Sequence, residues 1–152
     1  MPKFLKAVRL DDSDAALYAS ACDDGEWVTS GGFAVCPLAE GYRCNPKCHC
    51  DASFLSLTRR ARCTLAEVVE VTDQDLAIFR DQMAQHLLFD WKAPDFAAAR
   101  EIADEEIDYT VDLASAFPTE VWLRVQRSAG ADGAIEERYD QFDRLMIGSH
   151  PV

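Results

Sequence analysis

Two helical patterns decide the fold: residues 72–91 read TDQDLAIFRDQMAQHLLFDW, and residues 94–117 read PDFAAAREIADEEIDYTVDLASAF. In both, apolar side chains recur at the spacing of an amphipathic helix. Thr72 is a favourable N-cap residue for the first helix. Pro94 suits the first turn of the second, and Pro118 ends it. The short break between the patterns predicts an antiparallel pair of helices over 73–91 and 94–116.

The apolar face of this helix pair is expected to be buried, because an amphipathic helix places its apolar stripe on the core. We expect burial of Leu76, Phe79, Met83, Leu87, Phe96, Ala103 and Ile107.

Strand patterns flank the helix pair on both sides. The strands are expected over 3–10, 26–36, 53–59 and 63–71 before it, and over 121–126 and 134–143 after it,. Gly31-Gly32 inside the second strand predicts a bulge or a close approach of two backbones. The order β-β-β-β-α-α-β-β predicts an α+β fold: a mainly antiparallel sheet with the antiparallel helix pair packed on one face. We expect residues 1–152 to form a single domain.

The charge balance narrows the class of partner. The chain has 27 acidic and 15 basic residues and a net charge of −12, which repels phosphate backbones and argues against nucleic acid,. The basic run Arg59-Arg60-Ala61-Arg62 is expected to be a solvated strand face or a bend. No apolar run approaches the ~20 residues needed to span a bilayer. Charges interrupt the N-terminus too often for a signal peptide, so we expect a cytoplasmic protein that binds no membrane.

An irregular, cysteine-rich segment covers residues 36–52. Its cysteines are candidate zinc ligands, because zinc takes four nitrogen or sulfur ligands in a tetrahedron. The candidates are Cys36, Cys44, Cys48 and Cys50, with Cys63 and His49 as alternatives. The usual pair of Cys-x2-Cys motifs is missing. A disulfide, a reactive thiol, and a loop that merely contains cysteines therefore stay open as alternatives.

Three polar residues of the helix pair form a second candidate site. His86 and Asp90 are four residues apart and address the same side of the first helix, while Glu106 lies at the edge of the apolar face of the second,. If they converged, they could bind a metal or perform acid–base catalysis. Structural hydrogen bonds at the edges of the two helices are the alternative.

Four carboxylates of the second helix share one face, opposite its apolar stripe: Glu101, Glu105, Asp108 and Asp112,. Such a face is either solvated surface or an acidic docking surface for a basic protein partner. The sequence leaves a homo-oligomer open.

Several stretches resemble a family of small bacterial proteins of unknown function. They are Phe4–Asp11 with Gly25–Gly31, Ala84–Leu88, Ala93–Arg100 with Glu105–Ile107, and Gly133–Glu137. Together they cover nearly the whole chain. Genes of this family are expected beside molybdenum-enzyme or formate-dehydrogenase-type genes, so the resemblance implies an accessory role in the assembly of a redox enzyme. It implies no catalytic residues.

Three functions follow as expectations. The first is a non-enzymatic accessory or interaction protein, which the acidic helix face favours. The second is a zinc-binding protein that uses the cysteine segment. The third is a small enzyme with its site between the helices, although the nucleotide-binding, zinc-protease and serine-hydrolase motifs are absent from the sequence,.

Overall fold

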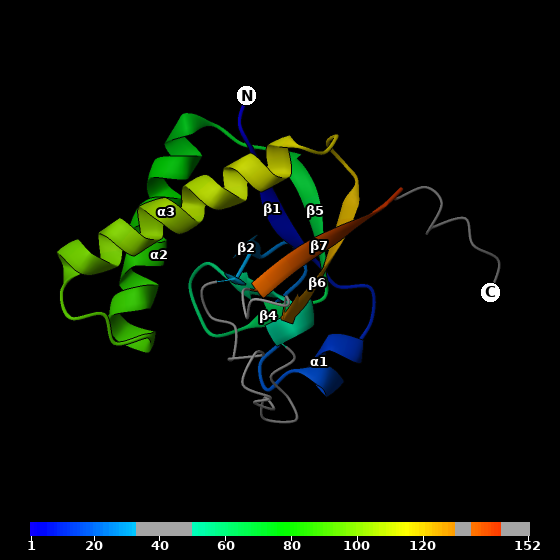
Figure 1. The fold of residues 1–152 in the computed structure, drawn as a ribbon, viewed down its shortest axis with the longest axis horizontal. Helices are drawn as coiled ribbons and strands as arrows, with labels where there is room; N and C mark the ends of the chain where they lie inside the picture. The colour runs from blue at the N-terminus through cyan, green and yellow to red at the C-terminus, as the bar shows by residue number, and fades with distance from the viewer. Residues whose placement is uncertain (33–49, 130–134, 144–152) are drawn as a thin grey trace.

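Seven strands form one sheet in the computed structural model, which describes residues 1–32, 50–129 and 135–143 (Figure 1). The strands are β1 (Lys3–Val8), β2 (Trp27–Thr29), β3 (Phe54–Ser56), β4 (Arg62–Cys63), β5 (Leu65–Glu70), β6 (Trp122–Ala129) and β7 (Ile135–Phe142). The helices are α1 (Ser13–Leu17), the short 3-10 helix η3 (Cys50–Ala52), α2 (Asp73–Asp90) and α3 (Phe96–Ser115).

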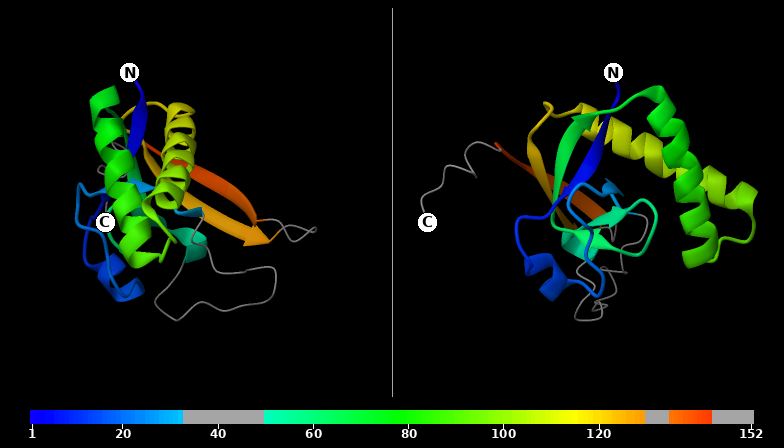
Figure 2. Two further views of the ribbon diagram at one scale, coloured as in Figure 1. Left: turned by 90° about the vertical axis from the view of Figure 1, so that its left-hand side faces the viewer. Right: turned by 180° about the vertical axis from the view of Figure 1, so that it is seen from behind.

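The sheet has the strand order β4-β3-β2-β1-β5-β6-β7, and all of its neighbours pair antiparallel. It curls, and α2 and α3 lie side by side against it (Figure 2). The predicted α+β class, with an antiparallel sheet and a helix pair, is confirmed.

One predicted strand is divided in two. The pattern over 63–71 gives β4 and β5, which are separated by Thr64. The Thr64 hydroxyl donates to Asp14 Oδ1 of α1 at 2.8 Å, and the chain changes direction there. Because of this bend, β4 pairs with β3 while β5 pairs with β1. Five strands therefore precede the helix pair, where the sequence predicted four.

Both long helices are capped by side chains. Thr72 caps α2 as predicted: its hydroxyl accepts from the Asp75 N–H, and the Asp75 carboxylate accepts from the Thr72 N–H,. The predicted start of the second helix at Pro94 is wrong by two residues, since α3 begins at Phe96. Asp95 is the reason: its carboxylate accepts from the Ala98 N–H at 2.8 Å and so fixes the N-cap one residue after the proline,.

The helix pair packs on the sheet through an aromatic cluster. The Phe79 ring of α2 lies 4.9 Å from the Phe4 ring and 4.8 Å from the Trp27 ring, centroid to centroid. The other residues of this core are predominantly aliphatic and come from α2, α3 and the chain around β3 and β5. They include Leu57, Val71, Met83, Ala84, Leu87, Ala99, Ala103 and Ile107. Most of the predicted buried face is therefore confirmed.

Phe96 was predicted to be buried and is 46% exposed, so that prediction is wrong. It is the first residue of α3, near the connection between the two helices, and it is not among the residues packed in that core. Leu76 is only partly buried and packs at the margin of the core.

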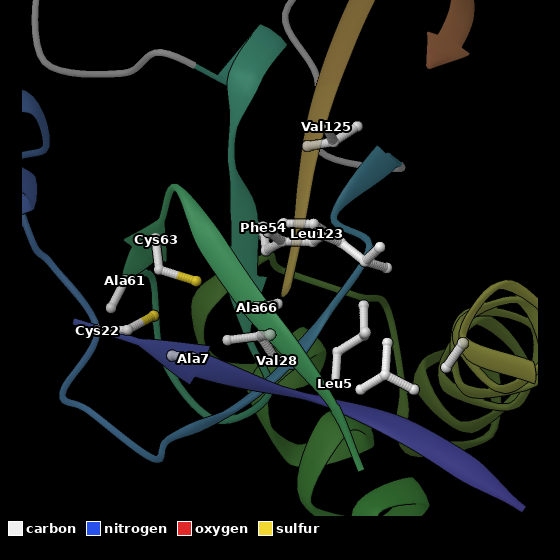
Figure 3. Packing of buried hydrophobic residues seen from close by; sticks show 12 residues of the cluster. Leu5, Ala7, Cys22, Val28, Phe54, Ala61, Cys63, Ala66, Leu123 and Val125 are labelled. Carbon is white, nitrogen blue, oxygen red and sulfur yellow. The ribbon is translucent and has the colours of Figure 1, made fainter. Parts of the chain in front are cut away.

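A second core fills the inside of the curled sheet, where side chains from β1, β2, β3, β5 and β6 meet (Figure 3). It includes Leu5, Val28, Phe54, Leu123 and Val125, and α3 contributes Ala114. Cys22 and Cys63 lie in this core as free, buried thiols that hydrogen-bond to each other. Burial raises the pKa of the Cys63 thiol, so this thiol is protonated and unreactive,.

The basic run over residues 59–62 was predicted to be a solvated strand face or a bend. It lies at a bend, but all three of its guanidinium groups contact other parts of the protein, Arg60 through the Trp91 ring and the Asp90 carbonyl. Arg59 pairs with Glu26 at 2.7 Å, and the buried Arg62 donates to Ser53 Oγ at 3.0 Å. The run therefore ties loops together and is not a free basic patch.

Candidate functional site

A cluster of hydrogen-bonded polar side chains, most of them buried or half-buried, lies where β2, α3, β6 and β7 meet. We name it the Arg127 cluster. It contains Ser30, Glu106, Tyr109, Thr110, Arg127, Glu137 and Tyr139. Buried polar groups are stable only when they are hydrogen-bonded, and this cluster joins segments that are distant in sequence.

Arg127 is at the centre of the cluster. Its side chain is fully buried, and Nε donates to Glu137 Oε2 at 2.6 Å. Nη1 donates to the carbonyl of Ser53 at 2.8 Å, and Nη2 donates to the carbonyl of Ser30 at 2.5 Å. One guanidinium group thus joins β6 to β7, to the end of β2 and to the chain before β3. Because its donors are used within the protein, Arg127 has a structural role.

The Glu137 carboxylate accepts hydrogen bonds from two neighbouring elements, β6 and α3. Besides Arg127, its carboxylate accepts from the Tyr109 hydroxyl of α3 at 2.5 Å. Burial alone would raise the pKa of Glu137, but the hydrogen bonds from Tyr109 and Arg127 outweigh it and hold this pKa below the usual value. The Tyr139 hydroxyl on the same strand lies 3.1 Å from Ser30 Oγ. Glu137 is therefore an ionised carboxylate that fastens α3 to β7.

The pKa of Glu106 is shifted in the opposite direction from that of Glu137. Burial raises its pKa to about 7, although the backbone N–H of Gly31, at 3.0 Å, and the Thr29 hydroxyl both stabilise the charged form. Nearby Glu137 adds to the increase by repulsion. Close to neutral pH, Glu106 therefore changes between a neutral acid and a buried anion.

The two glycines at the end of β2 make room for these contacts. Gly31 has φ of +79°, and a Cβ there would lie 2.9 Å from Leu55 Cβ. A Cβ on Gly32 would lie 3.1 Å from Glu137 Oε2. The close backbone approach predicted at Gly31-Gly32 is confirmed, since a side chain at Gly31 would collide with β3.

Glu106→Gln is expected to change how stability depends on pH. The folded chain keeps the Glu106 proton up to about pH 7, whereas the unfolded chain releases it near the ordinary pKa of 4.5. Stability from this group is fully present below pH 4.5 and is lost as pH rises to 7, because the folded state then binds more protons than the unfolded state,. The free energy of unfolding of the variant, minus that of the parent, should rise by about 3 kcal/mol between pH 4.5 and 8. Urea denaturation at several pH values measures it; parallel pH profiles would contradict the buried, proton-binding Glu106.

A groove of about 540 Å³ opens beside the Arg127 cluster. It is lined by Asp51, Ala52, Gln126, Arg127, Ser128, Glu136, Glu137 and Arg138. Both signs of charge occur in this lining, and Arg127 and Glu137 are bonded to each other. The lining therefore does not select one class of small ligand.

The candidate trio of the helix pair is only partly brought together. His86 Nε2 lies 3.5 Å from Asp90 Oδ2. Glu106 binds Gly31, just after the end of β2, whereas His86 contacts Leu57, whose N–H donates to Trp27 at the start of β2. These contacts place Glu106 and His86 at opposite ends of that strand.

His86 itself is held as a neutral ring. The Trp91 indole N–H can only donate, so at 3.1 Å His86 Nε2 must accept from it, and Nδ1 carries the proton that goes to the Leu57 carbonyl,. Burial lowers the pKa of His86, and the nearby Asp90 only partly offsets this effect. The ring therefore joins the C-terminal end of α2 to the chain after β3.

The cysteine prediction falls almost wholly outside the described residues. Cys36, Cys44 and Cys48 lie there, and Cys50 begins η3. Across residues 1–32, 50–129 and 135–143, no three His, Cys, Asp or Glu side chains are grouped so that they could hold a metal ion. A zinc site at residues 36–50 stays a prediction from the sequence.

The acidic face of α3 is solvent-exposed, and its carboxylates fall into two groups. Asp108 is exposed but pairs with Arg80 of α2 at 2.6 Å. Arg80 also reaches Asp104, and Arg100 reaches Asp81, so the acidic residues along the contact between the two helices are neutralised. Glu101, Glu105 and Asp112 are exposed, and no ion pair to them is found in the described part of the chain.

Two exposed apolar side chains lie beside these carboxylates. Ile102 is 40% exposed and Tyr109 is 45% exposed, and they are seven residues apart on α3. Glu105 and Asp112 lie one helical turn before and after Tyr109,. The Tyr109 hydroxyl is held by Glu137, so its ring is fixed in position.

The Arg127 cluster was not predicted from the sequence.

A family of unknown function, DUF6505, matches residues 1–146 of the chain. The chain belongs to this family. The resemblance seen in the sequence is thereby confirmed. No match was found among curated proteins or among solved structures. In the part of the chain that the structure describes, no helix has the length and apolar character needed to cross a membrane.

Proposed function

We propose that this DUF6505 protein is a non-enzymatic interaction protein that binds a basic segment of a partner protein through the acidic face of α3. The binding face consists of Glu101, Glu105 and Asp112, with Ile102 and Tyr109 beside them. The observation that carries the proposal is the uneven pairing of charges. Arginines neutralise the acidic residues between the helices, whereas these three carboxylates remain available to a partner.

The spacing of the face suits an extended or helical basic segment. Glu101, Glu105 and Asp112 fall within an arc of about 40° on the helix, over a length of roughly 16 Å. Ile102 and Tyr109 would contact the aliphatic part of lysine or arginine side chains, and the Tyr109 ring could stack on a guanidinium group. Because Glu137 already fixes Tyr109, little side-chain entropy would be lost on binding,.

We place this activity in a reducing compartment such as the cytoplasm. Cys22 and Cys63 provide a test of this placement, because two thiols in contact should stay free in a reducing compartment and form a disulfide in an oxidising one,.

Reversal of Glu105 and Asp112 to Lys is expected to slow association with the partner. The partner is first identified by affinity capture of the native protein from its own cells. The association rate of the captured partner is then measured at low and at moderate salt. Replacing two attractive charges by two repulsive ones should reduce the association rate about tenfold or more at low salt. For the parent, added salt should reduce the association rate.

A matched control distinguishes an effect of this face on the association rate from an effect of the net charge. Asp12→Lys with Asp51→Lys changes the net charge equally at exposed positions outside the helix pair. This control should associate nearly as fast as the parent. Equal rates for the parent and the Glu105/Asp112 variant, without salt dependence, would show that the face is solvated surface only.

A further inference from the structure

The outward face of α2 differs from the rest of the protein surface, because it carries no charge. At 100° per residue, five exposed or half-exposed side chains fall within an arc of about 80°. They are Gln74, Ile78, Gln82, Gln85 and Phe89. Ile78 is 48% exposed and Phe89 is 77% exposed, so the stripe contains two large exposed apolar side chains. Such a stripe stands out on a chain with a net charge of −12.

A carboxylate beside this stripe is neutralised by an arginine of α3. Asp81 lies at its edge, and its charge is paired with Arg100 of α3 at 2.6 Å. The five stripe residues are exposed on α2, and this helix lies side by side with α3 (Figure 2). The apolar residues that hold α2 on the sheet, such as Phe79 and Met83, lie on its other side. The residues of the stripe are therefore not needed for packing within the chain.

The stripe is also self-complementary. Gln82 and Gln85 lie equally far on either side of a point midway between Met83 and Ala84, and so do Ile78 and Phe89. If two copies of α2 pack antiparallel about a two-fold axis at that point, each Gln82 faces the partner's Gln85, and each Ile78 faces the partner's Phe89. Side-chain amides can donate and accept, so the glutamines can hydrogen-bond to each other.

The charges at the two ends of α2 agree with the same arrangement. Asp75 and Lys92 are also equally far from the midpoint, so each Lys92 would approach the partner's Asp75. Lys92 is exposed and directly follows the C-cap residue Trp91. In a parallel arrangement Asp75 would face the like-charged Asp75. Two copies that each carry −12 repel one another over most of their surfaces, and the uncharged stripe reduces this repulsion where they touch,.

We infer that a second copy of this chain docks on the outward face of α2 and forms an antiparallel, two-fold symmetric dimer through Ile78, Gln82, Gln85 and Phe89. The two-fold contact is isologous, in which one patch meets itself, and this is the commonest form of protein oligomer. It uses α2 and leaves the acidic face of α3 free.

The test uses sedimentation of the full chain from about 1 μM to about 1 mM, a range that covers weak self-association. The parent should pass from monomer to dimer within it. Gln82→Lys with Gln85→Lys places like charges in contact across the axis, so the dimer should weaken about tenfold or more. A matched control, Glu101→Gln with Asp112→Asn, changes the net charge equally on α3 and should not weaken the dimer.

The decisive variant is Gln82→Lys with Gln85→Glu. It places each new lysine opposite the partner's new glutamate only in the antiparallel two-fold arrangement, so its dimer should be at least as tight as that of the parent. A parent that remains monomeric over the whole range would overturn the inference. So would a Lys/Glu variant that associates as weakly as the Lys/Lys variant. Circular dichroism verifies that each variant is folded, since all of these side chains are on the surface.

Discussion

Arg127→Met is expected to lower the free energy of unfolding by about 3–5 kcal/mol, the usual cost of removing one partner of a buried ion pair. Methionine fills part of the same volume but cannot donate to Glu137, Ser30 or Ser53. The variant leaves the Glu137 carboxylate without its cation and two backbone carbonyls without their donor. Urea denaturation at neutral pH measures the loss.

Two comparisons make the Arg127 prediction specific. Arg138→Met, on the same hairpin but 71% exposed at its side chain, should change stability by less than about 0.5 kcal/mol,. Arg127→Met combined with Glu137→Gln should recover part of the loss, because the second change removes the uncompensated charge. A cost below about 1 kcal/mol for Arg127→Met alone would mean that the cluster does not hold the sheet and α3 together.

Phe79→Ala is expected to cost about 3–5 kcal/mol, as is usual when a buried phenylalanine is truncated. Phe79 is 4% exposed, and its ring contacts Phe4 and Trp27, so the truncation leaves a cavity between α2 and the sheet. Phe96→Ala removes the same side chain from an exposed position at the start of α3 and should cost less than about 1 kcal/mol,. Equal losses for the two variants would show that Phe79 does not anchor the helix pair.

The helix pair could be predicted from the sequence because its signals are local. Helical periodicity, the Thr72 cap and Pro94 all lie within one stretch of chain, and the structure gives α2 and α3 close to the predicted ranges. The error at Phe96 has a similar local origin. Periodicity assigns a residue to a face of the helix, but it does not say whether the core extends to that end of the helix.

The Arg127 cluster could not be predicted because it depends on strand register. Arg127 lies opposite Glu137 only because Ala129 pairs with Ile135. The sequence predicted strands over 121–126 and 134–143 but not their register, and a shift of one residue in the hairpin would move Glu137 to the other face of the sheet. The contacts of Glu106 with Gly31 also join segments 75 residues apart. No spacing rule connects such distant residues.

The candidate trio failed to converge for a related reason. Helical spacing correctly brings His86 near Asp90, four residues on,. Glu106 is on the neighbouring helix, and its position along that helix is set by how α3 crosses the sheet. Its carboxylate therefore meets the end of β2 and not His86.

Amide chemical shifts of the labelled full chain, followed as a lysine-rich peptide is added at moderate salt, test the proposed binding face most directly. Binding at this face predicts shift changes that concentrate on Glu101, Glu105, Tyr109 and Asp112 and that weaken as salt increases, because salt screens charges beyond roughly 8–10 Å. Changes spread evenly over exposed carboxylates elsewhere, such as Asp51 and Glu70, would mean that the peptide responds only to the net charge. That result, or the absence of any change on α3, would contradict the proposed function.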